Sequence, residues 1–290
     1  MLLPFGERLA RLPVGPAERF REARERMDAI VYRLIRERRA EVAAGARDRG
    51  NLLTMLVRAQ DAEEDGAGMT DEQVRDEALT ILLAGHETTA NALSWSWYFL
   101  ALDPGAERAL HDEVDAVLTT PDGHPRAATV DDLARLPYAR MVVSESMRLR
   151  PPAFVLGRRA LVPYEVPGTP WVLPARTTGF FSQHLLHRDA RFWPEPERFD
   201  PERWRGDVAS HGVAPSPGSR PRFAYFPFGA GTRVCIGEQF AWMELVLVLA
   251  TIARRWRLAL VPGHPVVPQP VITLRAKHGI RVVAHARVGA

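Results

Sequence analysis

The sequence has little cysteine, little lysine and no long uninterrupted apolar run. Cys235 is the only cysteine among 290 residues, which excludes an internal disulfide and any disulfide-based scaffold. Lysine also occurs once, at Lys277, and the other basic side chains are arginine. Of the two most apolar stretches, residues 81–102 contain His, Glu and Asn, and residues 240–253 are short and contain Glu. Neither stretch is predicted to span a membrane.

The sequence also lacks a strong excess of one charge. It has 38 basic and 35 acidic residues, with a net charge of +3, and the two signs are interspersed, so no nucleic-acid partner is predicted. Pro4 and Glu7 interrupt what would be the apolar core of a secretory signal. Together with the single cysteine, which fits a reducing compartment, this predicts a cytoplasmic location. The 46% hydrophobic content is enough for a substantial core.

The residues around Cys235 differ from the usual surroundings of a lone buried cysteine. Gly229 and Gly231 precede it and let the backbone approach a bound group closely. An apolar helix is predicted over 236–253, and the free N–H groups and dipole at its start favour a thiolate. Arg233 adds a positive charge nearby. Such a thiolate is typical of either a nucleophile or a soft metal ligand.

A long helix is predicted over 70–102, because Thr70 and Gln73 form a capping-box pattern at its start. Its middle, residues 84–89, reads AGHETT and contains a glycine and two adjacent threonines, which are poor helix formers. The pattern predicts a local opening with room for a small ligand and water. The stretch begins like the zinc motif His-Glu-x-x-His, but Ala90 occupies the position of the second ligand.

Other chemistry-bearing residues show weaker patterns. His111, His184 and His187 have no metal-ligand spacing and are interpreted as surface or capping residues. Glu145 and Arg148 stand three apart on a predicted helix, which alone indicates only a surface pair. Short strands bounded by Pro and Gly are predicted at 158–162, 169–173, 177–181, 256–261, 271–274 and 280–283.

The order of residues in the cysteine loop resembles the haem-ligand loop of the cytochrome P-450 superfamily. The matching pattern is Phe228-x-x-Gly231-x-Arg233-x-Cys235-x-Gly237. The resemblance implies that Cys235 is the proximal thiolate ligand of haem b, iron protoporphyrin IX. It also implies that seven residues contact the haem: Ala84, Gly85, Arg158, Phe228, Arg233, Ile236 and Gly237. Arg158 and Arg233 would bind the haem propionates.

The same resemblance gives a role to the middle of the long helix. Glu87 and Thr88 match the acid and alcohol pair that delivers protons during dioxygen activation. The implied reaction is a monooxygenation that uses dioxygen, a small lipophilic substrate and an external electron donor, namely a ferredoxin, a flavodoxin or a reductase. The alternatives are a haem-binding fragment without turnover, or a haem-thiolate peroxygenase or isomerase. The Glu87 and Thr88 pair favours dioxygen.

The resemblance further implies a structural cluster. The stretch from Trp193 to Trp204 is similar to the family's proline-rich meander, which supplies a second arginine to the Glu-x-x-Arg pair. The expected cluster is Glu145, Arg148 and Arg203, with Arg198 left open because its surroundings nearly duplicate those of Arg203.

The fold expected from this resemblance is mainly α, the C-terminal part of a cytochrome P-450 fold with a small β region. Residues 1–290 are expected to form one partial domain, with its main segments at 17–60, 70–102, 138–149, 192–204 and 225–253. Family members carry a longer segment ahead of the long helix. A misassigned start, a truncation or a second chain would each account for that difference.

Overall fold

A computed structural model describes residues 15–47, 50–59, 68–206, 220–221 and 223–287. Residues 48–49 and 60 of the expected 17–60 segment lie outside these ranges. The helices are α2 (Gly15–Ala43), α3 (Leu52–Arg58), α4 (Asp71–Leu102), α5 (Pro104–Val117), η1 (Val130–Arg135), α6 (Pro137–Leu149), α7 (Gln183–Leu186), η2 (Pro201–Trp204), η3 (Gly231–Arg233) and α8 (Glu238–Arg255). The strands are β1 (Leu156–Arg159), β2 (Tyr164–Glu165), β3 (Val172–Leu173), β4 (Thr178–Phe181), β5 (Trp256–Leu260), β6 (Pro268–Pro270), β7 (Leu274–Ala276) and β8 (Val282–Ala286).

The chain divides into two compact units, residues 1–84 and 85–290, with the boundary inside α4. In the first unit, Ile35 of α2, Val57 of α3 and Val74 of α4 form a small apolar core. The start of α4 is capped as predicted: the Thr70 amide donates to the Gln73 side chain, and the Gln73 amide donates to the Thr70 hydroxyl. The helices of this unit are therefore held by one apolar cluster and one reciprocal cap.

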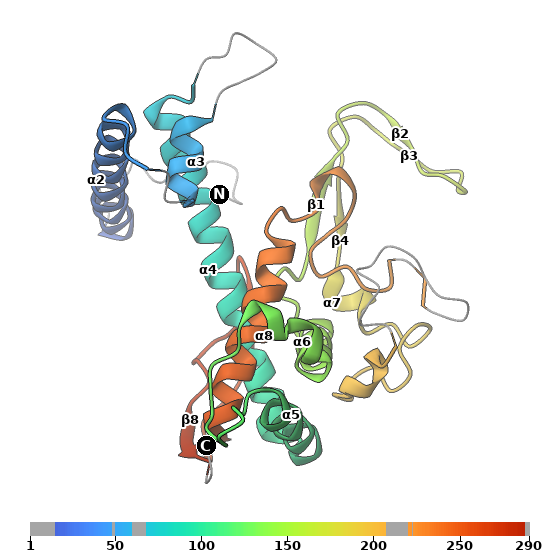
Figure 1. Ribbon diagram of the computed structural model, residues 1–290. Coiled ribbons are helices and arrows are strands. Elements are labelled where there is room, and N and C mark those ends of the chain that lie inside the picture. The colour runs from blue at the N-terminus through green and yellow to red at the C-terminus, as the bar shows by residue number, and fades with distance from the viewer. Residues whose placement is uncertain (1–14, 48–49, 60–67, 207–219, 222, 288–290) are drawn as a thin grey trace. The chain divides into compact units, whose positions relative to one another are not determined.

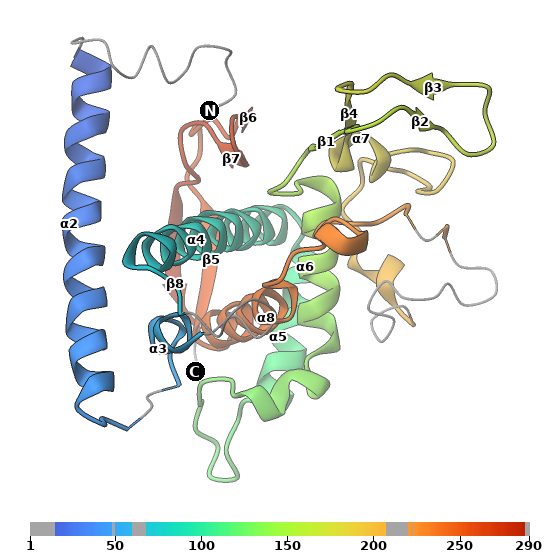
Figure 2. The same ribbon diagram turned by 90° about the horizontal axis from the view of Figure 1, so that it is seen from above.

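The second unit has a core shared by α5, α6, α8 and the part of α4 after residue 85. Figure 2 shows α8 beside α5 and α6, in agreement with the contacts between these helices. The core includes Leu100 of α4, Leu110 of α5, Val143 of α6, and Leu245 and Leu249 of α8. Because α8 packs against several helices, its first residues and the loop before them have a fixed base.

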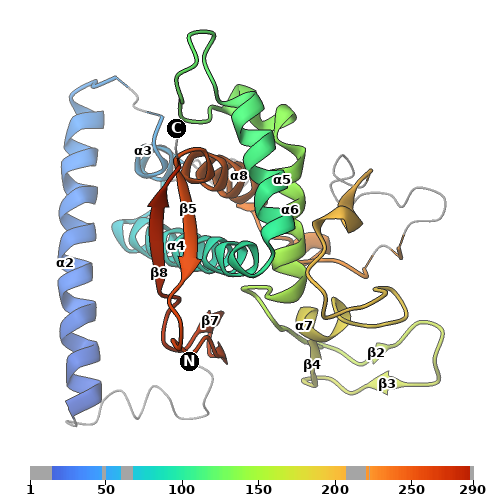
Figure 3. The same cartoon turned by 90° about the horizontal axis from the view of Figure 1, so that it is seen from below.

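The β region of the second unit consists of four antiparallel pairs: β1 with β4, β2 with β3, β5 with β8, and β6 with β7. Figure 1 shows the β2 and β3 hairpin continuing outward from β1 and β4. Figure 3 shows β5 and β8 as a longer ribbon. The described part of the chain is thus mainly α with small sheets, as predicted. Across these same residues, no helix combines the length and the apolar character that a bilayer crossing requires.

Two local predictions differ from the structure. Residues 84–89 stay helical within α4, so the predicted opening is wrong at the level of helical structure. The poor helix formers are tolerated because strong helical sequence flanks them on both sides. The strand predicted at 271–274 lies at 274–276 instead, because pairing with β6 sets its position.

Candidate functional site

The loop containing Cys235 is closed by backbone hydrogen bonds. The Cys235 amide donates to the Phe228 carbonyl at 3.0 Å, which draws the two ends of the glycine turn together. Gly229 and Gly231 have φ of 77° and 72°, a left-handed conformation that glycine adopts without steric cost. The Phe228 ring packs against the Trp242 ring of α8, with the two ring centroids 5.6 Å apart. The loop therefore has one conformation, fixed to the first turns of α8.

The thiol of Cys235 is exposed, and the surface around it is apolar. Ile236 is 91% exposed and Phe240 is 63% exposed, although both are large hydrophobic side chains. Gly237 keeps this surface low, since a Cβ there would lie 3.8 Å from the Cys235 sulfur. The Arg233 side chain is exposed on the same loop. A soft sulfur ligand, an apolar surface and a guanidinium suit a large flat group that combines iron, an apolar ring and carboxylates.

Arg158 lies on β1, opposite Gly179 of β4. Its guanidinium is exposed and donates to the carbonyl of its neighbour Gly157. The cysteine loop approaches this sheet, because a Cβ on Gly229 would lie 3.4 Å from the Leu156 side chain at the start of β1. The structure thus brings the loop next to the strand that carries Arg158. The Arg158 side chain is exposed on that strand.

The α4 residues predicted for the site lie on consecutive helical positions. Ala84 is the last residue of the first unit, and Gly85 opens the second. No described atom lies within 4 Å of a Cβ built on Gly85, so there is space beside the helix at this point. Glu87 and Thr88 are partly buried. The Glu87 carboxylate accepts a hydrogen bond from the Thr273 hydroxyl at 2.8 Å, a contact that the sequence analysis did not anticipate.

Comparison with known proteins decides the family. The family model for cytochrome P-450 matches residues 1–279. The chain belongs to the cytochrome P-450 family. It is 40% identical over 268 residues to "Cyclooctatin synthase" of Streptomyces melanosporofaciens, covering 92% of this chain and 54% of that protein. It is also 40% identical over 255 residues to "Cyclooctat-9-en-7-ol 5-monooxygenase" of the same organism, covering 88% and 51%.

Structural comparison agrees with the sequence comparison. A crystal structure of a cytochrome P-450 matches with a TM-score of 0.80 and 28% sequence identity, covering 99% of this chain and 60% of that one. The expected fold is confirmed. The chain spans about half the length of the curated cytochrome P-450 relatives it matches.

The expected charge cluster of this cytochrome P-450 chain is present, and its central pair is fully buried. Glu145 and Arg148 have no exposed side-chain surface and form a two-bond pair, with both nitrogen to oxygen distances at 2.8 Å. Arg203 approaches the same carboxylate at 3.3 Å, which confirms it as the second arginine. Arg198 instead pairs with Glu195 at the surface. Because Arg148 also donates to the carbonyls of His187, Pro196 and Arg198, the cluster fastens the meander to α6.

His187 connects this cluster to the cysteine loop, and its interpretation as a surface or capping residue is wrong. Its side chain is fully buried, and its Nε2 accepts from the Phe226 amide at 3.0 Å, so the proton is on Nδ1. The hydroxyl of Tyr225, the residue directly before Phe226, donates to the Ser144 carbonyl of α6 at 3.1 Å. The spacing of the histidines gives no signal for this contact. The loop before Cys235 is therefore anchored at two consecutive residues.

The burial of His187 predicts an acid-sensitive step in stability. Burial, with the nearby Arg148 charge, lowers the His187 pKa to about 3 from its ordinary 6.5. The unfolded chain binds this proton near pH 6.5 and the folded chain does not, so stability is lost as pH falls from 6.5 towards 3. We expect a loss on the order of 4 kcal/mol across that window. Denaturant unfolding at a series of pH values measures it.

A non-titrating replacement gives the control for this prediction. His187→Gln keeps an acceptor for the Phe226 amide, so its unfolding free energy should depend less on pH between 6.5 and 4. His285 is exposed on β8, and His285→Gln should leave the wild-type pH dependence unchanged. Equal pH dependence in the wild-type and His187→Gln chains would contradict the argument.

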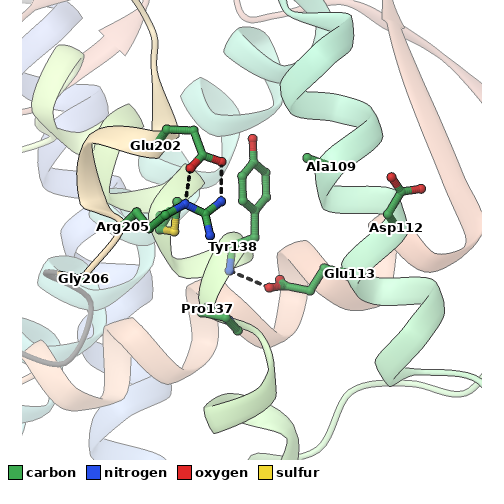
Figure 4. A pocket seen from close by; sticks show the side chains of 9 residues that line it. Ala109, Asp112, Glu113, Pro137, Tyr138, Glu202, Arg205 and Gly206 are labelled. Atoms are coloured by element: carbon green, nitrogen blue, oxygen red, sulfur yellow. Dashed lines mark hydrogen bonds and ion pairs between the residues drawn. The ribbon is translucent and has the colours of Figure 1, made fainter.

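A pocket of about 590 Å³ lies between α5, α6 and the meander and contains none of the predicted site residues (Figure 4). Glu113 lines it and accepts hydrogen bonds from the Tyr138 and Ala139 amides at 2.6 and 2.9 Å. Burial raises the Glu113 pKa, and the two amides oppose that shift. Glu202 and Arg205 form an ion pair on another wall. The carboxylate of Glu113 thus caps α6 from another helix, because the N-cap residue of α6, Leu136, makes no side-chain capping hydrogen bond.

Proposed function

We propose that this chain is the haem-ligating part of a cytochrome P-450 monooxygenase that oxidises a small lipophilic compound. The observation that carries the proposal is the free, exposed thiol of Cys235 on a fixed glycine loop at the start of α8, in a chain of this family. One of its relatives is named as the 5-monooxygenase of cyclooctat-9-en-7-ol, which supports an alicyclic, mostly apolar substrate class here.

The residues around Cys235 would hold haem b. Cys235 would supply the thiolate ligand, and Ile236 and Gly237 would form the apolar, low surface beneath the ring. Phe228, held against Trp242, would pack beside the sulfur. When bound, the haem supplies the redox-active iron that activates dioxygen, and a thiolate ligand favours cleavage of the O–O bond.

Two further groups of residues complete the proposed haem site. Arg233 and Arg158 would bind the propionates with planar, permanently charged guanidinium groups. Ala84 and Gly85 would lie at the opposite face, where the surface of α4 at Gly85 is free of a side chain. Small residues at these positions leave space for dioxygen and substrate.

The proposed chemistry needs protons at a defined place. One oxygen atom of dioxygen enters a C–H bond of the substrate and the other leaves as water, which consumes two electrons and two protons. In this proposal Glu87 exchanges protons with solvent and the Thr88 hydroxyl passes them inward. The proposed electron donor is a ferredoxin, a flavodoxin or a reductase, because the one cysteine of this chain would ligate the haem and cannot also hold an iron–sulfur cluster.

The half-length match favours one alternative, a haem-binding fragment without turnover. Two measurements on the full chain distinguish a monooxygenase from a haem-binding fragment and from a peroxygenase. A carbon monoxide difference spectrum of the reduced protein reports whether haem is bound through a thiolate. Dioxygen consumption and product formation with a surrogate ferredoxin and reductase then report turnover. A thiolate-type spectrum without product under any electron supply would favour the fragment, and product formed with peroxide alone would favour a peroxygenase.

Thr88→Ala tests the proposed proton path. Alanine is a better helix former than threonine, so stability should change by only about 1 kcal/mol. Losing the hydroxyl should lower substrate oxidation on the order of 100-fold, while dioxygen is still consumed and released as hydrogen peroxide. The ratio of peroxide to product measures the effect, and Thr88→Ser, which keeps a hydroxyl, is the control. An unchanged ratio in Thr88→Ala would exclude this hydroxyl as the relay.

A further inference from the structure

The carboxylate of Glu87 is part of a chain of three side chains. Thr273 donates its hydroxyl proton to Glu87 Oε1 at 2.8 Å, and the same hydroxyl oxygen accepts from Asn91 Nδ2 at 3.0 Å. Thr273 is only 6% exposed and comes from the segment just before β7, far from α4 in sequence. Asn91 lies four residues after Glu87, so both face the same side of α4. Thr273 therefore bridges one helical turn.

The direction of these hydrogen bonds is determined by their chemistry. A threonine hydroxyl has one proton, and here Glu87 accepts it. The hydroxyl oxygen can then only accept, which matches the amide donor of Asn91. Hydrogen bonds to a carboxylate are stronger than neutral ones, and a donor that itself accepts a bond is polarised further. Glu87 Oε1 is thus held by a donor of fixed orientation.

The backbone that carries Thr273 is itself anchored. Leu274, the next residue, accepts a hydrogen bond at its carbonyl from Trp95 Nε1 at 2.9 Å, and its amide donates to the Pro152 carbonyl at 2.9 Å. Asn91 and Trp95 are four residues apart on α4, so two successive turns of that helix hold the Thr273–Leu274 segment. Trp95 is almost fully buried, which protects this anchor from water. The hydroxyl of Thr273 consequently has a fixed place beside α4.

We infer that Thr273, oriented by Asn91, is a positioning residue that fixes one oxygen of Glu87 and leaves the other, Oε2, for proton exchange. Among the described residues no hydrogen bond reaches Oε2, and this oxygen is not one of the buried atoms that lack a partner, so it has contact with solvent. The inference rests on the proposed function, because it gives Glu87 its role in proton delivery. It adds that a hydroxyl 186 residues further along the chain sets the orientation of that carboxylate.

The contact itself is tested by a double-mutant cycle on unfolding of the full, haem-bound chain. The variants are Thr273→Val, which keeps the shape and loses the hydroxyl, Glu87→Ala, and the double variant. We expect the change in the unfolding equilibrium constant of the double variant to differ about tenfold from the product of the two single changes, as for a hydrogen bond to a charged group. Thr273→Ser should restore most of the stability lost in Thr273→Val. Ser94→Ala removes a hydroxyl that donates to the Ala90 carbonyl within α4, and its effect on the free energy of unfolding should be additive with that of Glu87→Ala.

The positioning role is tested by how reducing equivalents are divided between product and peroxide. Thr273→Val should raise the peroxide share several-fold while the carbon monoxide spectrum stays unchanged, and Thr273→Ser should keep the wild-type share. The inference would be overturned if the two single changes in the unfolding constant simply multiplied in the double variant, or if the peroxide share were unchanged in Thr273→Val. If the cycle were non-additive but the chain gave no thiolate-type spectrum, the contact between Thr273 and Glu87 would be real. The proposed function would then be wrong, and so would the role of this contact in proton delivery.

Discussion

A Cys235→Ala chain is expected to fold normally and to lose the thiolate-type haem spectrum completely. The sulfur is the only one in the chain that can act as a thiolate, so no other residue can replace it. The loop should survive, because the bond that closes it joins the Cys235 amide and the Phe228 carbonyl, both of which alanine retains. Since the side chain is exposed, the free energy of unfolding of the haem-free chain should change by about 0.5 kcal/mol or less.

Two further replacements sharpen this test. Cys235→Ser keeps the size of the side chain but not a soft ligand, and it should lose the same spectrum. Cys235→His supplies a nitrogen ligand, so it should bind haem with an altered spectrum and without the electron donation of a thiolate. The measurements are the carbon monoxide difference spectrum, the ratio of haem to protein and denaturant unfolding. A thiolate-type spectrum in Cys235→Ala would remove the central assignment.

The parts of this structure that local sequence determines are the ones that the sequence predicted well. The start of α4 follows from Thr70 and Gln73, which bond to each other across three residues. The start of α5 is determined in the same local way, because the Asp103 side chain accepts from the Gly105 and Ala106 amides. Such contacts need no knowledge of the tertiary structure, and a pattern of residue types is enough to predict them.

Long-range contacts explain what the sequence did not reveal. His187 was interpreted as exposed, yet it is buried against the Phe226 amide, 39 residues later. The partner of Glu87 is Thr273, and no spacing rule connects these positions. The charge cluster is an intermediate case: Glu145 and Arg148 are three residues apart, but Arg203 could be chosen only through resemblance to the family. The roles of the haem-site residues remain predictions, because they concern a group that this chain would bind.

The second large effect is expected for Glu145→Ala, which removes the centre of the buried cluster. Its two oxygens accept bonds from Arg148, from the Asp200 amide at 3.0 Å and from Trp204 Nε1 at 3.1 Å, and they pair with Arg203. Without the carboxylate, Arg148 stays buried with no opposite charge, and breaking a buried pair in this way costs roughly 3 to 5 kcal/mol. That is a large share of the stability of a typical domain.

Removing the Glu145 carboxylate should also disturb the haem site. Arg148 holds the His187 carbonyl, and the His187 ring accepts from the Phe226 amide in the loop before Cys235. We therefore expect Glu145→Ala to unfold at lower denaturant concentration and to fail to retain haem. Glu145→Gln, which keeps the shape but not the charge, should be intermediate. Arg198→Ala removes an exposed ion pair from the neighbouring meander and should cost about 0.5 kcal/mol or less. If Glu145→Ala were as stable and as fully loaded with haem as Arg198→Ala, the buried cluster would not be what holds the cysteine loop in place.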